Sequence, residues 1–152
     1  MGRSDRKTKR EFEPKGDKKA FISENPGGYY HLSPQFIFRR YDKKAPWSNS
    51  FNNKPVVDSV MDHLKSKEGL LWKEIMAQSG GRSSGTNSHH IKIAKFSSEA
   101  QRRAKYINLN ESELFSMRFE GDVRLWGIIE PDGRCYVIWY DPNHKVCPSE
   151  KS

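Results

Sequence analysis

Apolar and polar positions alternate most regularly in the last third of the chain. Three alternating runs follow one another there, ELFSMRFEG, DVRLWGIIE and RCYVIWYD. Alternation with a period of two predicts β-strands, and the EPDG before the last run is typical of a tight turn. The last run is apolar at every second position in both phases, so we expect it to be a central strand. Its two predicted faces are Cys135, Val137 and Trp139 on one side and Tyr136, Ile138 and Tyr140 on the other.

Earlier in the chain the pattern predicts one more strand and two helices. The run PQFIFRRYD, residues 34–42, alternates and is predicted to be a strand. After Pro55, apolar residues recur at helical spacing until Gly69, which is expected to end a helix. The run LLWKEIMAQ repeats that spacing, so two short amphipathic helices in a hairpin are predicted.

The segment before the last three strands predicts a further strand and a short helix. HHIKIAKF alternates, and SSEAQRRAKY has Ser97 or Ser98 in position to cap a helix. The full order is strand, helix, helix, strand, short helix and three strands. That order predicts an α+β domain, a mainly antiparallel twisted sheet with helices packed on one face.

Charge divides the chain into an arm and a domain. Residues 1–33 are charge-rich and contain too few apolar residues to fold alone, so we expect a flexible basic arm. The folded domain is expected at residues 34–148, followed by a tail at 149–152. The formal net charge of +8 indicates an anionic partner such as RNA or DNA, the alternative being that it only aids solubility.

The two cysteines indicate a reducing compartment. Cys135 and Cys147 are twelve residues apart, with no C-x-x-C or Cys/His spacing around them. Neither a zinc site nor a disulfide framework is predicted, so we expect the protein in the cytoplasm. No apolar run is long enough to span a membrane, and no cofactor is indicated.

Polar residues gather where the last predicted strand ends. Asp141, His144 and Lys145 follow that strand, and Arg118 and Arg124 are predicted neighbours on the two strands before it. Two adjacent guanidiniums repel each other unless an anion or a carboxylate lies between them. Either a substrate phosphate is that anion, or Glu120 and Asp122 of the intervening turn are those carboxylates. Asp141 either orients His144 or caps the turn that follows the strand.

Two other pairs are further candidates for binding RNA phosphate. His90 and Lys92 share a face of their predicted strand, and Arg39 and Arg40 lie in the first strand. Exposed strand polarity is the alternative for the His90 pair. The adjacent histidines His89 and His90 point to opposite faces of a regular strand, so no metal site is predicted there.

Together these groups suit metal-independent cleavage of RNA. A His or Lys base takes the proton of a 2′-hydroxyl, and that oxygen attacks the adjacent phosphate. Arg or Lys stabilises the charge on the phosphate, and an acid protonates the departing 5′-oxygen.

The run ELFSMRFEGDVRLWGIIEPDGRCYVIWYDPNHKVCP resembles the C-terminal half of RelE-type toxins of bacterial toxin–antitoxin systems. It is most similar to a branch whose final strand runs into DP-x-H-K, matched here by Asp141, Pro142, His144 and Lys145. The resemblance implies a compact RelE-like sheet and an endoribonuclease that cleaves mRNA, often on the ribosome. It also implies an antitoxin that covers the basic site. The basic arm and the GGRSSGTNS loop are additions to the family's pattern.

The resemblance also implies roles for individual residues. The catalytic set is His144, Lys145, Arg118 and Tyr140, and Arg124 contacts phosphate beside Arg118. Whether Tyr140 or His144 is the acid or base stays open. Two alternatives remain, a non-catalytic RNA- or ribosome-binding module and a basic protein-interaction subunit, and cleavage of RNA distinguishes the toxin from both.

Overall fold

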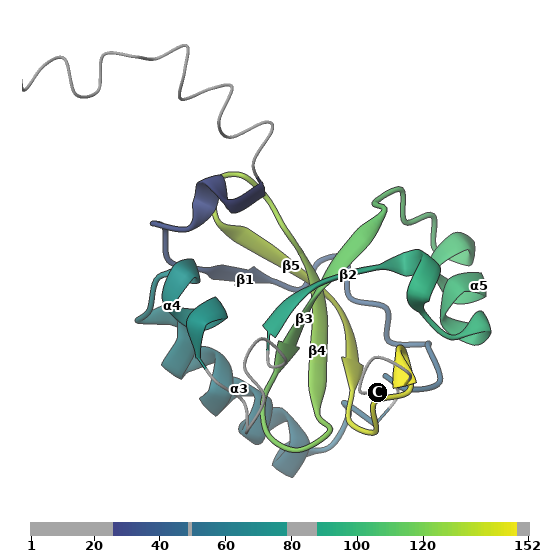
Figure 1. The fold of residues 1–152 in the computed structure, drawn as a ribbon. Helices are drawn as coiled ribbons and strands as arrows, with labels where there is room; N and C mark the ends of the chain where they lie inside the picture. Colours follow the sequence, from purple (N-terminus) through teal and green to yellow (C-terminus); the bar gives the residue numbers. More distant parts are fainter. Residues whose placement is uncertain (1–25, 49, 79–87, 149–152) are drawn as a thin grey trace, which may run out of the picture.

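The computed structural model describes residues 26–48, 50–78 and 88–148, and Figure 1 shows their arrangement. In chain order the elements are η1 (Pro26–Tyr29), β1 (Gln35–Ile37), α3 (Lys54–Glu68), α4 (Trp72–Ala77), β2 (Ser88–Lys92), η2 (Ile93–Lys95), α5 (Ser98–Tyr106), β3 (Glu113–Arg118), β4 (Arg124–Ile129) and β5 (Arg134–Asp141). The predicted order of strands and helices is confirmed. Asn53 caps the N-terminus of α3 and Ser97 that of α5, each through its side-chain oxygen.

The strands form one five-stranded sheet in the order β1-β5-β4-β3-β2. β1 is parallel to β5, and the other neighbouring pairs are antiparallel. β5 lies between β1 and β4, which confirms that the last strand is central. The α+β class and the mainly antiparallel sheet are therefore confirmed.

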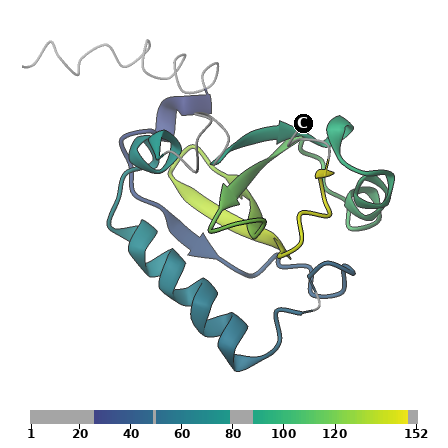
Figure 2. The same cartoon turned by 60° about the horizontal axis from the view of Figure 1, so that its bottom comes forward.

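Helices cover both faces of the sheet, so the prediction that they pack on one face is wrong. On one face, here called the α3 face, Leu64 of α3 and Trp72 of α4 pack against β3, β4 and β5. On the other, the α5 face, Ala100 and Ala104 bring α5 close to the sheet. Figure 2 shows α3 and α5 on opposite sides of the strands. Apolar spacing identifies the buried side of a helix, but it does not state which sheet face that helix covers.

A β-bulge in β5 changes the predicted faces of that strand. Trp126 lies opposite Trp139 and Gly127 lies opposite Val137, so Ile138 is an extra residue. Ile138 and Trp139 both pack on the α5 face, whereas Tyr140 packs on the α3 face. The predicted grouping of Trp139 with Cys135 and Val137 is therefore wrong, as is that of Tyr140 with Tyr136, because alternation assumes an unbulged strand.

The described domain begins before residue 34, and its first strand is shorter than predicted. Tyr29 is buried in the core, and the carbonyl of Leu32 accepts a hydrogen bond of 2.9 Å from the N–H of Trp72. β1 ends at Ile37, because the chain then turns, with the N–H of Tyr41 donating to the carbonyl of Phe38. Residues 1–25 of the predicted arm and the tail at 149–152 lie outside the described residues.

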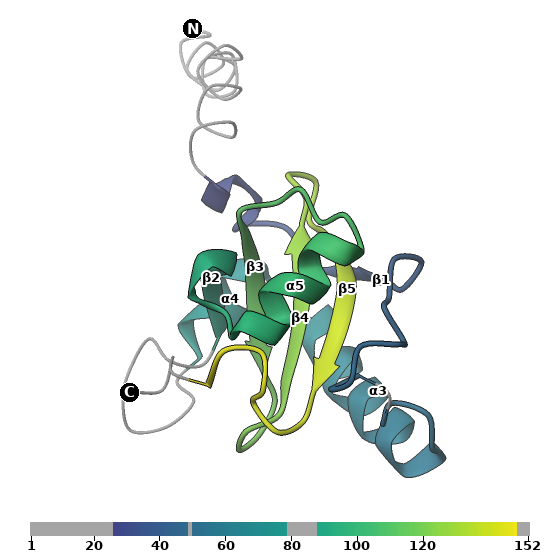
Figure 3. The ribbon, with the colours of Figure 1, turned by 90° about the vertical axis from the view of Figure 1, so that its right-hand side faces the viewer.

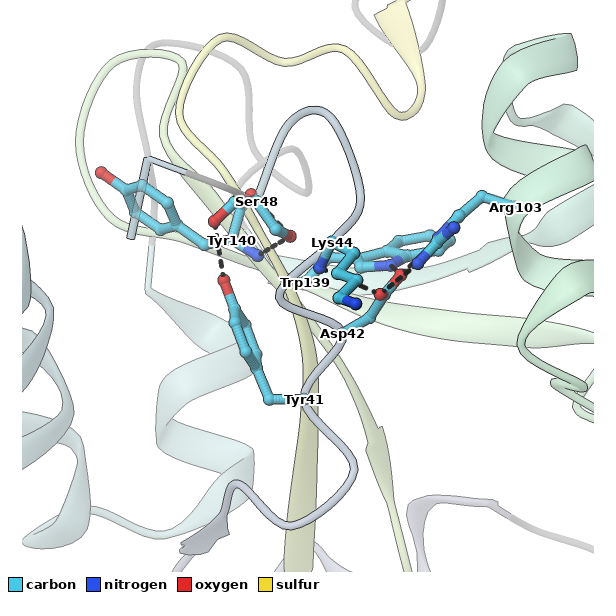
Figure 4. Close-up of polar contacts among 7 residues, drawn as sticks. All are labelled: Tyr41, Asp42, Lys44, Ser48, Arg103, Trp139 and Tyr140. Atoms are coloured by element: carbon cyan, nitrogen blue, oxygen red, sulfur yellow. Dashed lines mark hydrogen bonds and ion pairs between the residues drawn. The ribbon is translucent and has the colours of Figure 1, made fainter. Parts of the chain in front are cut away.

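Beyond β1, the loop that leads to α3 continues along β5 (Figure 4). The N–H of Asp42 donates to the carbonyl of Ile138 at 2.9 Å. The hydroxyl of Ser48 then accepts from the N–H of Tyr140 at 3.1 Å and donates to its carbonyl at 3.3 Å. These bonds satisfy the edge of β5 that the short β1 leaves open. None of the helices in the described ranges is long and apolar enough to cross a bilayer.

Candidate functional site

Three charged residues form a cross-strand row at the end of the sheet where β3 turns into β4. Arg118 lies opposite Arg124, and Arg124 lies opposite Asp141. Directly opposed residues share a face of the sheet, as do residues two apart in one strand. Arg124 and Asp141 are each two residues from Trp126 and Trp139, which pack on the α5 face, so the row lies on that face. The prediction that Arg118 and Arg124 are neighbours is confirmed. We call Arg118, Arg124, Asp141, His144 and Lys145 the strand-end site.

The turn between β3 and β4 fixes the guanidinium of Arg124. Its Nη1 donates to the carbonyl of Gly121 at 2.9 Å and to that of Val123 at 3.3 Å. The residue is only 6% exposed. Arg118 is half-buried, and its backbone N–H donates to the Ser88 hydroxyl at 3.2 Å. One residue of the pair is therefore held inside the protein, and the other is only half-buried.

Asp141 organises the segment that follows β5. Its fully buried carboxylate accepts hydrogen bonds from the N–H of Lys145 at 2.8 Å, from the N–H of Val146 at 3.0 Å and from the indole of Trp126 at 3.2 Å. The sequence left open whether Asp141 orients His144 or caps the turn after the strand. These contacts with backbone N–H groups are those of a cap. The carboxylate ties the loop back onto the end of the strand from which it leaves.

His144 and Lys145 lie inside this capped loop. Figure 3 shows the segment after β5 crossing the α5 face of the sheet below α5. His144 is 7% exposed and has a left-handed backbone with φ of 56°, whereas Lys145 is exposed. The next residue, Val146, is buried, and its carbonyl accepts from the N–H of Ser97 at 2.8 Å. Both ends of the loop are thus fixed, which holds His144 and Lys145 beside the charged row.

Tyr140 is not part of this arrangement. Its side chain is buried on the α3 face and lies against Phe51, with ring centroids 5.4 Å apart. Burial raises the pKa of its hydroxyl above the ordinary value. The bulge at Ile138 is the reason, because it turns Asp141 toward the α5 face and Tyr140 away from it.

His90 and Lys92 also lie on the face opposite the strand-end site. The His90 ring packs against Phe115 with centroids 5.1 Å apart, and burial lowers its pKa. Lys92 is exposed, at the end of β2. His89 lies opposite Ser116, on the α5 face, so its position in the sheet is the nearer of the two histidines to the charged row. The sequence predicted opposite faces for the pair, but it could not show which face carries the site.

Arg39 and Arg40 lie toward the other end of β5. Their guanidinium carbons are 5.7 and 5.6 Å from the ring centroid of Tyr136, and that of Arg134 is 5.8 Å away. We call these four residues the Tyr–Arg cluster. Alternation places Arg134 and Tyr136 on one face, but the contact with Arg39 and Arg40 depends on the parallel pairing of β1 with β5. No local pattern reveals that pairing.

In the described part of the chain, no three or more His, Cys, Asp or Glu side chains are grouped so that they could hold a metal ion. The catalytic candidates of the strand-end site are an imidazole, an ammonium and two guanidiniums, those of His144, Lys145, Arg118 and Arg124. Comparisons of the chain with protein-family models, with curated proteins and with solved structures gave no match.

Proposed function

We propose that this protein is a metal-independent endoribonuclease of the RelE type, with the strand-end site as its active site. The observation that carries the proposal is the cross-strand row of Arg118 and Arg124, with the loop of His144 and Lys145 tied to the same strand end by Asp141. Paired guanidiniums on adjacent strands suit the two non-bridging oxygens of a phosphodiester.

In this proposal His144 is the base that takes the proton of the 2′-hydroxyl, because imidazole is the side chain best suited to proton transfer near neutral pH. The 2′-oxygen attacks phosphorus, and the bond to the 5′-oxygen breaks. Arg118 and Arg124 stabilise the added negative charge, and Lys145 protonates the departing 5′-oxygen. The products are a 2′,3′-cyclic phosphate and a 5′-hydroxyl. Tyr140 has no role, since it lies on the other face.

The biological setting that goes with this activity is that of a toxin–antitoxin pair. The substrate would be mRNA, cut on the ribosome in the cytoplasm. An antitoxin would cover the basic site when the toxin is silent. The resemblance of residues 113–148 to RelE-type toxins is the support for this setting.

A non-catalytic RNA-binding module is the second candidate, and burial is the observation that favours it. His144 is 7% exposed and Arg124 is 6% exposed, so little of either side chain is open to a substrate. In this reading the exposed Lys145 and the half-buried Arg118 hold the RNA backbone without cutting it.

Cleavage by purified protein, with a chelator present, tests the proposal. The central variant is His144→Asn, because Asn tolerates the left-handed backbone of residue 144 and cannot act as a base. We expect it to lower the cleavage rate by about 10²- to 10⁴-fold while the thermal unfolding midpoint is kept. Lys105→Gln, on the exposed side of α5, is the matched control for Lys145→Gln.

The same variants are then expressed in bacteria and scored for growth and for mRNA integrity. The toxin is supported if the wild type arrests growth and fragments mRNA and His144→Asn does neither. Intact RNA in every assay, with ribosomes and without them, favours the binding module instead.

A further inference from the structure

The Tyr–Arg cluster holds three guanidiniums around a single ring. Arg39, Arg40 and Arg134 each lie 5.6 to 5.8 Å from the Tyr136 centroid, within the range of cation–π attraction. The Nη2 of Arg39 also donates to the Tyr136 hydroxyl at 3.3 Å. The ring therefore orders three like charges that would otherwise repel one another, and this reduces the side-chain entropy lost when an anion binds.

The positive charge of the cluster is only partly neutralised. Arg134 pairs with Asp132 at 2.9 Å, and Arg40 lies 3.9 Å from Glu111. Among the described residues, no carboxylate pairs with Arg39. The side chains of Arg134 and Arg40 are 41% and 38% exposed, so these ion pairs are weak and can open to an incoming phosphate.

More cations lie between this cluster and the strand-end site. The loop after β1 runs along β5, where the N–H of Asp42 bonds to the carbonyl of Ile138, and the next two residues are the exposed Lys43 and Lys44. Figure 4 shows Lys44 beside Asp42 and Trp139. Asp42 itself is neutralised by Arg103. Lys43 and Lys44 therefore lie near Ile138, beyond Tyr136 in the direction of the strand-end site.

We propose that the Tyr–Arg cluster is a second phosphate site, which anchors a single RNA strand whose scissile phosphate lies at the strand-end site. The inference rests on the proposed function, because it assigns a path to that substrate. Five residue steps separate Tyr136 from Asp141, a span of roughly 16 Å. Lys43 and Lys44 contact the backbone between the two sites. An RNA too short to cover this span binds at one site only.

Binding of RNA oligonucleotides of increasing length tests this path. Every protein carries His144→Asn, so that the RNA stays intact, and affinity is measured by fluorescence anisotropy. The parent binds strands longer than the span more tightly than strands shorter than it. In Arg39→Ala/Arg134→Ala we expect affinity for long strands to fall roughly tenfold and the length dependence to disappear. The slope of log affinity against log salt falls by about 0.7 for each lost phosphate contact.

Matched variants separate this inference from the proposed function. Arg102→Ala/Lys105→Ala removes the same charge from the exposed side of α5 and is expected to retain the length dependence. If the cluster variant binds long strands as tightly as the parent while Arg118→Ala weakens binding, the second site is refuted and the strand-end site stands. If the parent binds no RNA, both are refuted. If the cluster variant no longer binds a polyglutamate peptide but keeps its affinity for RNA, the cluster binds an acidic protein and the RNA path is refuted.

Discussion

Asp42 and Arg103 form a two-bond ion pair that joins the loop after β1 to helix α5. The Nε of Arg103 donates to Oδ2 at 2.8 Å, and its Nη2 donates to Oδ1 at 2.7 Å. The same carboxylate accepts from the indole of Trp139 at 2.7 Å, so the pair also contacts β5 (Figure 4). The two side chains are 7% and 21% exposed. Charges so far removed from water are stabilised only by these partners. The pair also anchors the loop that carries Lys43 and Lys44 to helix α5.

Removing one partner of this pair is expected to destabilise the fold. Arg103→Met leaves the Asp42 carboxylate buried with only its neutral donors, and we expect a loss of about 3 kcal/mol in the free energy of unfolding. Urea titration measures it as a lower midpoint. Arg102→Met, on the neighbouring exposed position of α5, is the control and should change the free energy by less than about 0.5 kcal/mol. Equal midpoints for the two variants would contradict the role of the pair.

The same pair makes stability depend on acid. Burial alone would raise the pKa of Asp42, but hydrogen bonds from Arg103 and Trp139 and the charge of Arg103 outweigh it and lower the pKa below 3.8. Since the folded pKa is lower than the unfolded one, this contribution is fully present above about pH 4 and is lost as the pH falls through the folded value. Urea midpoints should therefore fall less steeply below pH 4 in Asp42→Asn than in the wild type. Parallel pH curves would contradict this.

A methyl group at Gly127 is expected to disturb the bulge. A Cβ there would lie 2.8 Å from the Sγ of Cys135 and 2.8 Å from the carbonyl oxygen of Tyr136. The carbonyl belongs to the paired strand and cannot move aside without breaking the ladder. Gly127→Ala should therefore lower the free energy of unfolding by about 1–3 kcal/mol. Gly69→Ala, where a Cβ would meet nothing within 4 Å, is the control in the same thermal unfolding series.

The sequence predicted the elements of this fold well because their signals are local. The N-cap at Ser97, the end of α3 at Gly69 and the alternating runs of β3 and β4 depend on residues close together in the chain. The face of the sheet that α5 covers depends on contacts with distant strands. The same is true of the length of β1, which ends where the chain turns toward Asp42.

The candidate site was predicted where it depended on the last two hairpins and on the residues that follow the final strand. Arg118 and Arg124 face each other because a short turn joins their strands. The position of Tyr140 was not predictable, because the bulge at Ile138 changes alternation without any Gly or Pro in β5 itself. Gly127, on the opposing strand, was the one available signal, since a glycine inside a strand indicates a bulge or a close approach of another backbone.

Asp141 is expected to control both stability and activity through the loop that it caps. In Asp141→Asn one carboxylate oxygen becomes an NH₂ group, which cannot accept a hydrogen bond, so either the N–H of Lys145 on Oδ1 or that of Val146 on Oδ2 loses its acceptor. We expect a loss of about 1–3 kcal/mol in the free energy of unfolding and faster hydrogen exchange at the amide that loses its acceptor. If the strand-end site cleaves RNA, the freed loop should also lower the cleavage rate, because His144 and Lys145 lose their fixed positions.

Asp122→Asn, at an exposed carboxylate of the β3–β4 turn, is the control. Unchanged exchange at Lys145 and Val146 would show that the loop is held by other contacts, such as those of buried Val146 and Cys147.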